Sequence, residues 1–208
     1  MKKAPVVKLS LRKLLVAMLA VGPVAFLPAP LLATLPSAGS ITVSSGSASL
    51  AVAGLQATIT STDRAVLNWG TVAGGLGTVT AFNIGAGETY NFLVPAGGSV
   101  LNKVVAGTDG VAAFINGTLS SNGRVFVLAN GNINIGDGAA INTTGGLVLS
   151  TLAEATDLTY VVNGDLSYTG LSQGSITIGG ASVLSNLNAW AGRDRKSTRL
   201  NSSHVSES

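Results

Sequence analysis

Cysteine is absent from this chain of 208 residues, and histidine occurs only once, at His204. The lack of cysteine excludes a disulfide scaffold and a cysteine-based metal site. One histidine near the C-terminal end leaves no basis for a Cys-His pair or a histidine zinc site, and a Ser-His-Asp triad would depend on His204 alone. We therefore predict no catalytic residue, no metal site and no cofactor.

Charge is also scarce, since charged residues make up 10% of the chain. The formal net charge of +3 comes from basic residues at the two ends. Between residues 40 and 193 there are four basic and seven acidic residues, which gives a net charge of −3. The basic excess of the whole chain therefore gives no support for nucleic-acid binding.

Long apolar runs are missing after residue 39, and the one such run lies at the N-terminus. A basic segment, Met1–Lys13, is followed by the apolar run Leu14–Leu27 and then by small residues. This order is typical of a secretory signal peptide. The alternative, a transmembrane anchor, needs roughly 20 apolar residues, and Pro23 interrupts this run. We predict a signal peptide over residues 1–39 that is cleaved near its end.

Proline is nearly absent beyond that segment. Five of the six prolines lie in residues 1–39, whereas 26 of the 27 glycines follow Ala38. This shift in composition marks a domain boundary. Hydrophobic residues make up 46% of the chain, but after residue 39 they come in short pieces. That pattern is typical of strands around a β core, so we predict one β domain over residues 40–193.

Short apolar runs alternate with turn signals between Gly117 and Thr151. No run is long enough for a helix, and β-branched residues favour strands. Asn-Gly and Gly-Gly pairs adopt positive φ at little cost, so each predicts a corner between strands. Strands this short and this closely spaced suit a coil wound around its own core better than a hairpin sheet. The predicted strands are Val125–Leu128, Ile133–Ile135, Ala140–Ile141 and Leu147–Leu149, and the predicted corners are Asn122-Gly123, Asn130-Gly131, Gly136-Asp137-Gly138 and Gly145-Gly146.

The same stretch resembles the N-terminal secretion domain of filamentous haemagglutinin-type exoproteins, the passengers of two-partner secretion. It shares with them a Gly-containing lead, the strand Val125–Leu128, a Gly-rich turn and the closing run Gly145–Thr151, in that order. One segment departs from the family: Ala129–Asn132 stands where the family has Asn-Pro-Asn-Gly. A turn is still encoded there, but the proline is gone.

The resemblance covers roughly residues 40–155. Ala65–Trp69 and Phe82–Phe92 match family segments in order, and residues 70–81 between them are an insertion. Because the insertion is rich in glycine, threonine and valine, we predict a surface loop or an extra short strand pair. Further strands are predicted at Leu158–Tyr168 and Ser175–Ile178.

This resemblance implies an all-β fold, a right-handed parallel β-helix with short extra-helical strands and an N-terminal cap. It implies export through the periplasm of a Gram-negative-type bacterium to the medium or the cell surface. The implied partner is an outer-membrane β-barrel transporter with periplasmic recognition domains, and glycans are candidate ligands of a downstream region. The residues that the resemblance assigns to transporter recognition are Asn122, Gly123, Arg124, Phe126, Asn130, Gly131, Asn132 and Ile133.

Two other functions stay open on the residues alone. The altered Asn-Pro-Asn-Gly turn and the insertion favour considering a surface adhesin or matrix protein that is exported without a two-partner transporter. A polysaccharide-cleaving β-helix enzyme would need clustered carboxylates. The aspartates here are scattered beside glycine or asparagine, so we interpret them as turn formers. They are Asp109, Asp137, Asp157 and Asp165.

The remaining polar and aromatic residues have structural interpretations. Asparagine recurs near the predicted turns, where its amide can hydrogen-bond stacked neighbours. We expect Arg124 to face solvent, and Trp69 and Phe126 to lie in the core.

Residues 194–208 break abruptly with the Gly/Val/Ile pattern. Asp194–His204 is what a common sequencing-library adapter encodes when it is read in frame. We therefore predict that residues 194–208 are a disordered, adapter-derived artefact and that the natural chain continues past Arg193. A natural basic tail is the alternative.

Overall fold

A computed structural model describes residues 35–74, 77–152, 156–168, 174–180, 182–184 and 187–190. Most of the predicted signal peptide (residues 1–34) lies outside the described residues. The predicted domain end at Arg193 and the tail 194–208 with His204 lie outside them as well.

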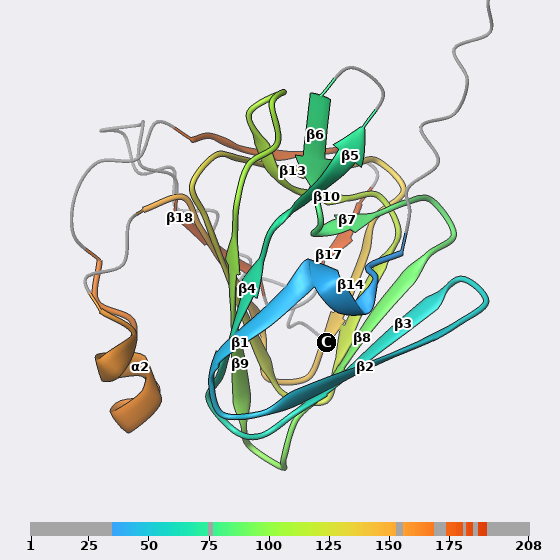
Figure 1. The fold of residues 1–208 in the computed structure, drawn as a ribbon. Helices are drawn as coiled ribbons and strands as arrows, with labels where there is room; N and C mark the ends of the chain where they lie inside the picture. Colours follow the sequence, from blue (N-terminus) through green and yellow to red (C-terminus); the bar gives the residue numbers. More distant parts are fainter. Residues whose placement is uncertain are drawn as a thin grey trace, which may run out of the picture. The chain divides into compact units, whose positions relative to one another are not determined.

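The described strands form three large sheets and one two-stranded sheet (Figure 1). The first large sheet contains, in spatial order, β1 (Ile41–Ser45), β4 (Ala65–Trp69), β9 (Ser99–Val104), β12 (Arg124–Ala129), β15 (Leu147–Ser150) and β18 (Leu187–Trp190). The second contains β17 (Val183–Leu184), β14 (Ala140–Thr143), β11 (Thr118–Ser121), β8 (Thr89–Leu93), β3 (Gln56–Ser61) and β2 (Ala48–Ala53). The third contains β16 (Ile176–Ile178), β13 (Asn132–Ile135), β10 (Val111–Ile115) and β7 (Asn83–Ile84). The prediction of an all-β fold is confirmed.

From β7 onward the chain visits the three sheets in a fixed order, and each strand pairs in parallel with the strand three places later. In the first sheet β9 pairs with β12, β12 with β15, and β15 with β18. The other two sheets repeat this pattern. The first two strands differ, because β1 and β2 are antiparallel to β4 and β3. The strands predicted between Gly117 and Thr151 are therefore present, as β12 to β15.

The core lies between the three sheets and follows from alternation along each strand. In β12, Val125 and Val127 are fully buried in the main hydrophobic core, whereas Phe126 and Leu128 point to the other face of the sheet. Parallel pairing places Val125 directly between Val100 and Leu147 of the neighbouring strands. Side chains of one kind therefore stack from strand to strand.

Four aromatic rings fill the core beside β4, β7 and β8. Phe82 lies at the centre, with its ring centroid 4.9 Å from Trp69, 5.8 Å from Tyr90 and 6.4 Å from Phe92. All four side chains are fully buried. The prediction that Trp69 is a core residue is confirmed. The Tyr90 hydroxyl donates to the carbonyl oxygen of Asn83 at 2.8 Å, and burial, reinforced by the charge of Glu88, raises the pKa of this phenol far above its ordinary value.

The corners contain glycine mainly because the chain packs closely there, and less because a positive φ is needed. This corrects the sequence argument that these glycines are required for positive φ. Of the glycines in the predicted corners between 117 and 151, only Gly146 has a left-handed φ. At Gly123 an added Cβ would lie 2.2 Å from Val94 Cγ2 and 2.5 Å from the Gly98 oxygen. At Gly131 it would lie 2.6 Å from the Gly110 oxygen. These corners need glycine because the preceding strand connection passes directly against them.

The strand predicted at Leu158–Tyr168 is wrong, because Asp157–Asn163 forms the helix α2. The Thr156 side chain caps the helix start by accepting from the Leu158 N–H, and Gly164 ends it in the left-handed conformation. These local signals outweigh the β-branched residues that suggested a strand. Asp157 is accordingly not a turn residue: it opens α2 and forms an ion pair with Lys103 across 2.7 Å.

Of the two alternatives predicted for the insertion at residues 70–81, a surface loop or an extra short strand pair, the structure contains the strand pair. β5 (Thr71–Gly74) and β6 (Gly77–Thr80) pair in antiparallel register and make the two-stranded sheet. A short 3-10 helix, η1 (Ala38–Ser40), precedes β1. Within the part of the chain that the structure describes, no helix is both long and apolar enough to cross a membrane.

Candidate functional site

The eight residues predicted for recognition lie at the two ends of β12. Asn122, Gly123 and Arg124 form the corner before the strand, with Phe126 two residues further on. Asn130, Gly131 and Asn132 form the corner after it, and Ile133 follows inside β13. The structure therefore divides the predicted set into two separate corners.

We call each passage of the chain through the three large sheets a level. At the first corner, Asn122 joins two successive levels, because it follows β11 and bonds to Val94, which follows β8. Its Nδ2 donates to the Val94 carbonyl oxygen, and its Oδ1 accepts from the Val94 N–H, both at 2.8 Å. An asparagine amide can make this paired contact because it offers a donor and an acceptor together. The prediction that corner asparagines hydrogen-bond stacked neighbours is confirmed here.

Arg124 follows at the same corner and is exposed, as predicted. Its Nε donates to the carbonyl oxygen of Gly145, the corner of the next level, at 3.1 Å. The side chain is thus held along the outside of the stack while the guanidinium stays accessible.

A groove of about 460 Å³ runs along this corner. Its floor includes Phe126, and its walls come from the loop before β4, the turns at three successive levels and the end of α2. Two arginines and two aspartates supply its charge. The groove is lined by Asp63, Arg64, Gly97, Gly98, Ser99, Asn122, Gly123, Arg124, Phe126, Thr144, Gly145, Asn163, Gly164 and Asp165.

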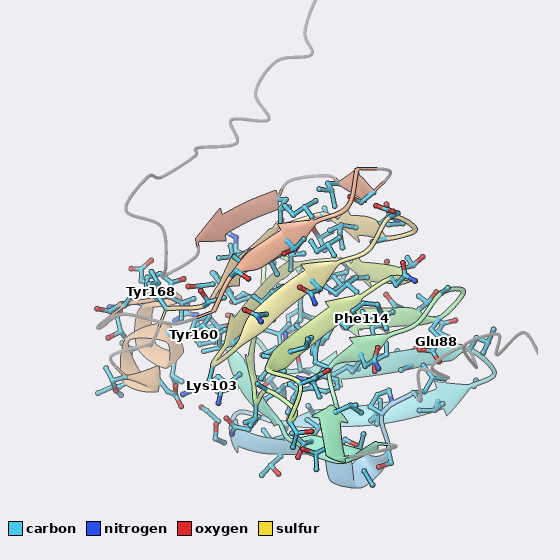
Figure 2. The ribbon with its side chains drawn as sticks, turned by 90° about the horizontal axis from the view of Figure 1, so that it is seen from above. Glu88, Lys103, Phe114, Tyr160 and Tyr168 are labelled. Carbon is cyan, nitrogen blue, oxygen red and sulfur yellow. The ribbon has the colours of Figure 1, made fainter. Side chains whose placement is uncertain are left out.

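Helix α2 closes one side of the groove by packing on the outer face of the first sheet. Phe126 is 7% exposed, and its ring lies 5.5 Å from that of Tyr160, which is fully buried. Val66, Leu101, Leu128 and Val148 are the other buried members of this second hydrophobic cluster. Figure 2 shows Tyr160 and Tyr168 together on the α2 side, away from Phe114 and Glu88. Phe126 is therefore a core residue as predicted, but of this outer cluster.

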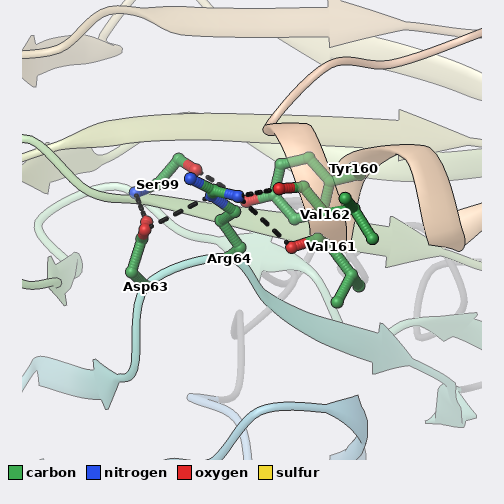
Figure 3. A network of polar contacts seen from close by, with 6 residues as sticks. All are labelled: Asp63, Arg64, Ser99, Tyr160, Val161 and Val162. Atoms are coloured by element: carbon green, nitrogen blue, oxygen red, sulfur yellow. Dashed lines mark hydrogen bonds and ion pairs between the residues drawn. The ribbon is translucent and has the colours of Figure 1, made fainter.

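Polar contacts fix α2 against the loop before β4 (Figure 3). Arg64 Nη1 donates to the carbonyl oxygens of Val161 and Val162, near the negative end of the helix. Arg64 also lies 3.4 Å from Asp63, whose Oδ1 accepts from the Ser99 N–H at 2.9 Å. Arg64 has a φ of 54°, and it is the only non-glycine residue with positive φ among those described.

The second corner repeats the arrangement of the first. Asn130 is exposed, and its Oδ1 accepts from the Ala106 N–H at 2.7 Å. Asn132 Oδ1 accepts from the Ser175 N–H at 2.9 Å. Ile133 is fully buried in the main core. Of the eight predicted residues, Asn122, Arg124 and Asn130 are exposed, and the other five are buried or half-buried.

Sequence reasoning missed the contributions of Asp63, Arg64 and Asp165 to the groove. Thr156 and Gly164 carried a recognisable helix start and stop signal, which would have placed α2. Nothing local in the sequence connects Arg64 with a helix almost 100 residues later. In the described ranges, no group of three His, Cys, Asp or Glu side chains is placed to hold a metal ion.

Comparison with known proteins identifies a similar solved structure. No family model matches the chain, and no curated protein matches it. Among solved structures, it is similar to the crystal structure of the HMW1 secretion domain from Haemophilus influenzae, with 27% sequence identity and a TM-score of 0.53. The match covers 67% of this chain and 34% of that one, so the chain matches about a third of the solved neighbour.

Proposed function

We propose that this chain is the N-terminal secretion domain of a larger exported protein, the passenger of a two-partner system. Its partner would be an outer-membrane β-barrel transporter that recognises it through periplasmic domains. The observation that carries the proposal is the likeness to the HMW1 secretion domain over 67% of the chain. The sequence motif around β12 points in the same direction independently.

We further propose that the three large sheets are the faces of a right-handed parallel β-helix, capped at its N-terminal end by β1 and β2. The fixed visiting order and the parallel pairing of every third strand support this. In such a coil each level buries its apolar side chains against the previous level. Folding can then propagate from one end, which suits a chain that crosses a membrane before it folds.

The exposed corner residues are the proposed contacts with the transporter. Asn122 and Arg124 line the groove beside α2, and Asn130 stands at the other end of β12. The buried members of the predicted set, Gly123, Phe126 and Ile133, would act by holding the corners in shape. The turn at Asn130 therefore contributes a surface even though this chain lacks the family's proline there.

A non-enzymatic role is part of the proposal. Three of the four aspartates that the sequence predicts as turn formers lie in different parts of the fold. Asp109 accepts from the Val111 N–H in its own turn, Asp157 pairs with Lys103, and Asp165 lies in the groove. The groove also holds Asp63, but its Oδ1 accepts from the Ser99 N–H and its Oδ2 lies 3.4 Å from Arg64 Nε. These structural contacts of the carboxylates support a binding domain over a glycosidase, which needs two facing carboxylates.

The proposal is tested by titrating the full chain with the purified periplasmic domains of a candidate two-partner barrel protein from the same organism. Saturable binding is expected, and the combined variant Asn122→Ala, Arg124→Ala and Asn130→Ala should weaken it at least tenfold. Asn142→Ala, an exposed asparagine on β14, is the matched control and should bind as the natural chain does. No binding by the natural chain, or equal binding by both variants, would contradict the proposed contacts.

A further inference from the structure

Among the described strands, the edge strand β2 lacks the features that protect the edges formed by β1 and β7. Among the described strands, β2 ends the second sheet and pairs only with β3 (Figure 1). It is six residues long and pairs with β3 in unbroken register. By contrast, β1 has a register shift between Val43 and Ser45, and β7 is two residues long. Bulges and short strands are common means by which proteins block an edge, and β2 has neither.

The composition of β2 also lacks the residues that would prevent another strand from pairing with it. Its sequence, Ala-Ser-Leu-Ala-Val-Ala, contains no proline and no charged residue, and no charge occurs anywhere between residues 41 and 62. Lysine and proline are the usual residues that stop an edge from accepting another strand. Val52 and Leu55 of the same hairpin are 49% and 63% exposed, which adds apolar surface beside the edge.

The register with β3 determines which backbone groups face outward. Ala53 pairs with Gln56 across the two-residue turn, and the Ser47 carbonyl oxygen accepts from the Thr62 N–H. In an antiparallel ladder alternate residues direct both their N–H and C=O to the same side. The odd-numbered residues of β2 therefore bond to β3. Ala48, Leu50 and Val52 present their N–H and C=O groups to the free edge.

We propose that β2 is a self-association surface, on which the β2 strand of a second copy of this chain pairs in antiparallel register. With a two-fold axis at Leu50, Leu50 faces Leu50 of the other copy, and Ala48 faces Val52. All six outward backbone groups of each strand then find partners. Because β2 carries no charge, the pairing brings no like charges together. The Leu50 side chain packs against the main core, and in the dimer the two Leu50 side chains lie next to each other on that same face of the sheet.

This proposal does not depend on the transporter, because no residue of β2 lines the groove. A second copy is favoured over a foreign strand because its β2 satisfies length, polarity and register at once. One six-residue strand is less than a stable dimer interface normally provides, so association is expected to be reversible at roughly 10 µM to 1 mM protein.

The lack of cysteine in the chain makes a direct test possible. Ser49 and Ala51 are exposed on the outer face, and the proposed register places Ser49 of one copy opposite Ala51 of the other in a non-hydrogen-bonded pair. Such pairs have Cα atoms about 4.5 Å apart, within disulfide range, whereas Ser49 to Ser49 is a diagonal of roughly 7–8 Å. Under mild oxidation, a mixture of full-chain Ser49→Cys and Ala51→Cys should therefore cross-link several times faster than either variant alone.

Thr60→Cys, exposed on β3 one strand inside the edge, is the control and should cross-link only at the background rate. A mixture no faster than this control would overturn the proposal, and so would faster cross-linking of either variant with itself. A second measurement uses Val52→Pro, which removes an outward N–H and no bond to β3. Its sedimentation should show self-association weakened roughly tenfold or more, since two symmetry-related hydrogen bonds are lost. Equal association of the natural chain and Val52→Pro would contradict the pairing, and the cross-linking result decides the matter if this variant fails to fold.

Discussion

The indole Nε1 of Trp69 donates a hydrogen bond to Oδ1 of Asn102 across 2.8 Å in the fully buried core. Asn102 Nδ2 in turn donates to the Phe126 carbonyl oxygen at 3.1 Å. One amide thus links β4, β9 and β12, three neighbouring strands of the first sheet. Asn102→Leu would remove both bonds and leave the buried Trp69 N–H without this partner, so we expect a loss of roughly 1–3 kcal/mol in the free energy of unfolding.

Urea unfolding of the full chain measures this loss. The control is Asn142→Ala, on an exposed position of β14, which should change stability by less than about 0.5 kcal/mol. Equal unfolding midpoints for the two variants would show that the Trp69–Asn102 bond contributes nothing.

The close approach at Gly123 gives a second prediction. An alanine Cβ would lie 2.2 Å from Val94 Cγ2 and 2.5 Å from a backbone oxygen, and the backbone cannot yield without moving the corner. We expect Gly123→Ala to cost about 1–3 kcal/mol of unfolding free energy. Gly70→Ala is the matched control, because no atom lies within 4 Å of its added Cβ. Denaturant unfolding of both variants should separate them clearly, and a neutral Gly123→Ala would disprove the packing explanation.

The attachment of α2 depends on Tyr160 in this account. Tyr160→Ala removes the ring against Phe126 and the hydroxyl that donates to Ser99 Oγ at 3.0 Å. Loss of a buried aromatic side chain costs about 3–5 kcal/mol, so the helix should detach locally. Amide hydrogen exchange across Asp157–Asn163 is then expected to accelerate strongly. Leu158→Ala, at a side chain 66% exposed on the same helix, should leave exchange nearly unchanged. Unchanged protection in Tyr160→Ala would contradict the assigned role.

The raised pKa of Tyr90 predicts that the chain loses stability at alkaline pH. Its folded pKa is raised above the ordinary 10.0 by burial and by Glu88, so the folded chain keeps a proton that the unfolded chain releases. The contribution is complete below pH 10 and decreases as pH rises further, by about 1.4 kcal/mol per pH unit. Unfolding free energies of the chain and of Tyr90→Phe, measured from pH 8 to 11, should converge or cross in favour of the variant. A constant difference over this range would contradict the raised pKa.

The strands of the central stretch could be predicted because their pattern is local. β-branched residues between turn residues specify strands at 125–128 and 133–135 through local preference alone, without tertiary contacts. The helix α2 was missed because Val161 and Val162 suggest a strand, although the caps at Thr156 and Gly164 decide the outcome.

The groove could be predicted only in part. Asn122 and Arg124 belong to a motif that is visible in the sequence, whereas Arg64 reaches α2 through tertiary contacts. The corner glycines were recognised as corners for the wrong reason. Their need for space arises from neighbouring levels of the stack, and a sequence does not state which levels become neighbours.

The most direct test of the central claim is export. Residues 1–193, with a reporter fused after Arg193, are produced in a Gram-negative host with or without a candidate two-partner barrel protein from the same organism, and the reporter is quantified in the medium and at the cell surface. The account predicts export only when the barrel is present, with periplasmic retention when it is absent. Equal export with and without the barrel, or retention in both, would contradict the proposal that this chain is a two-partner secretion domain.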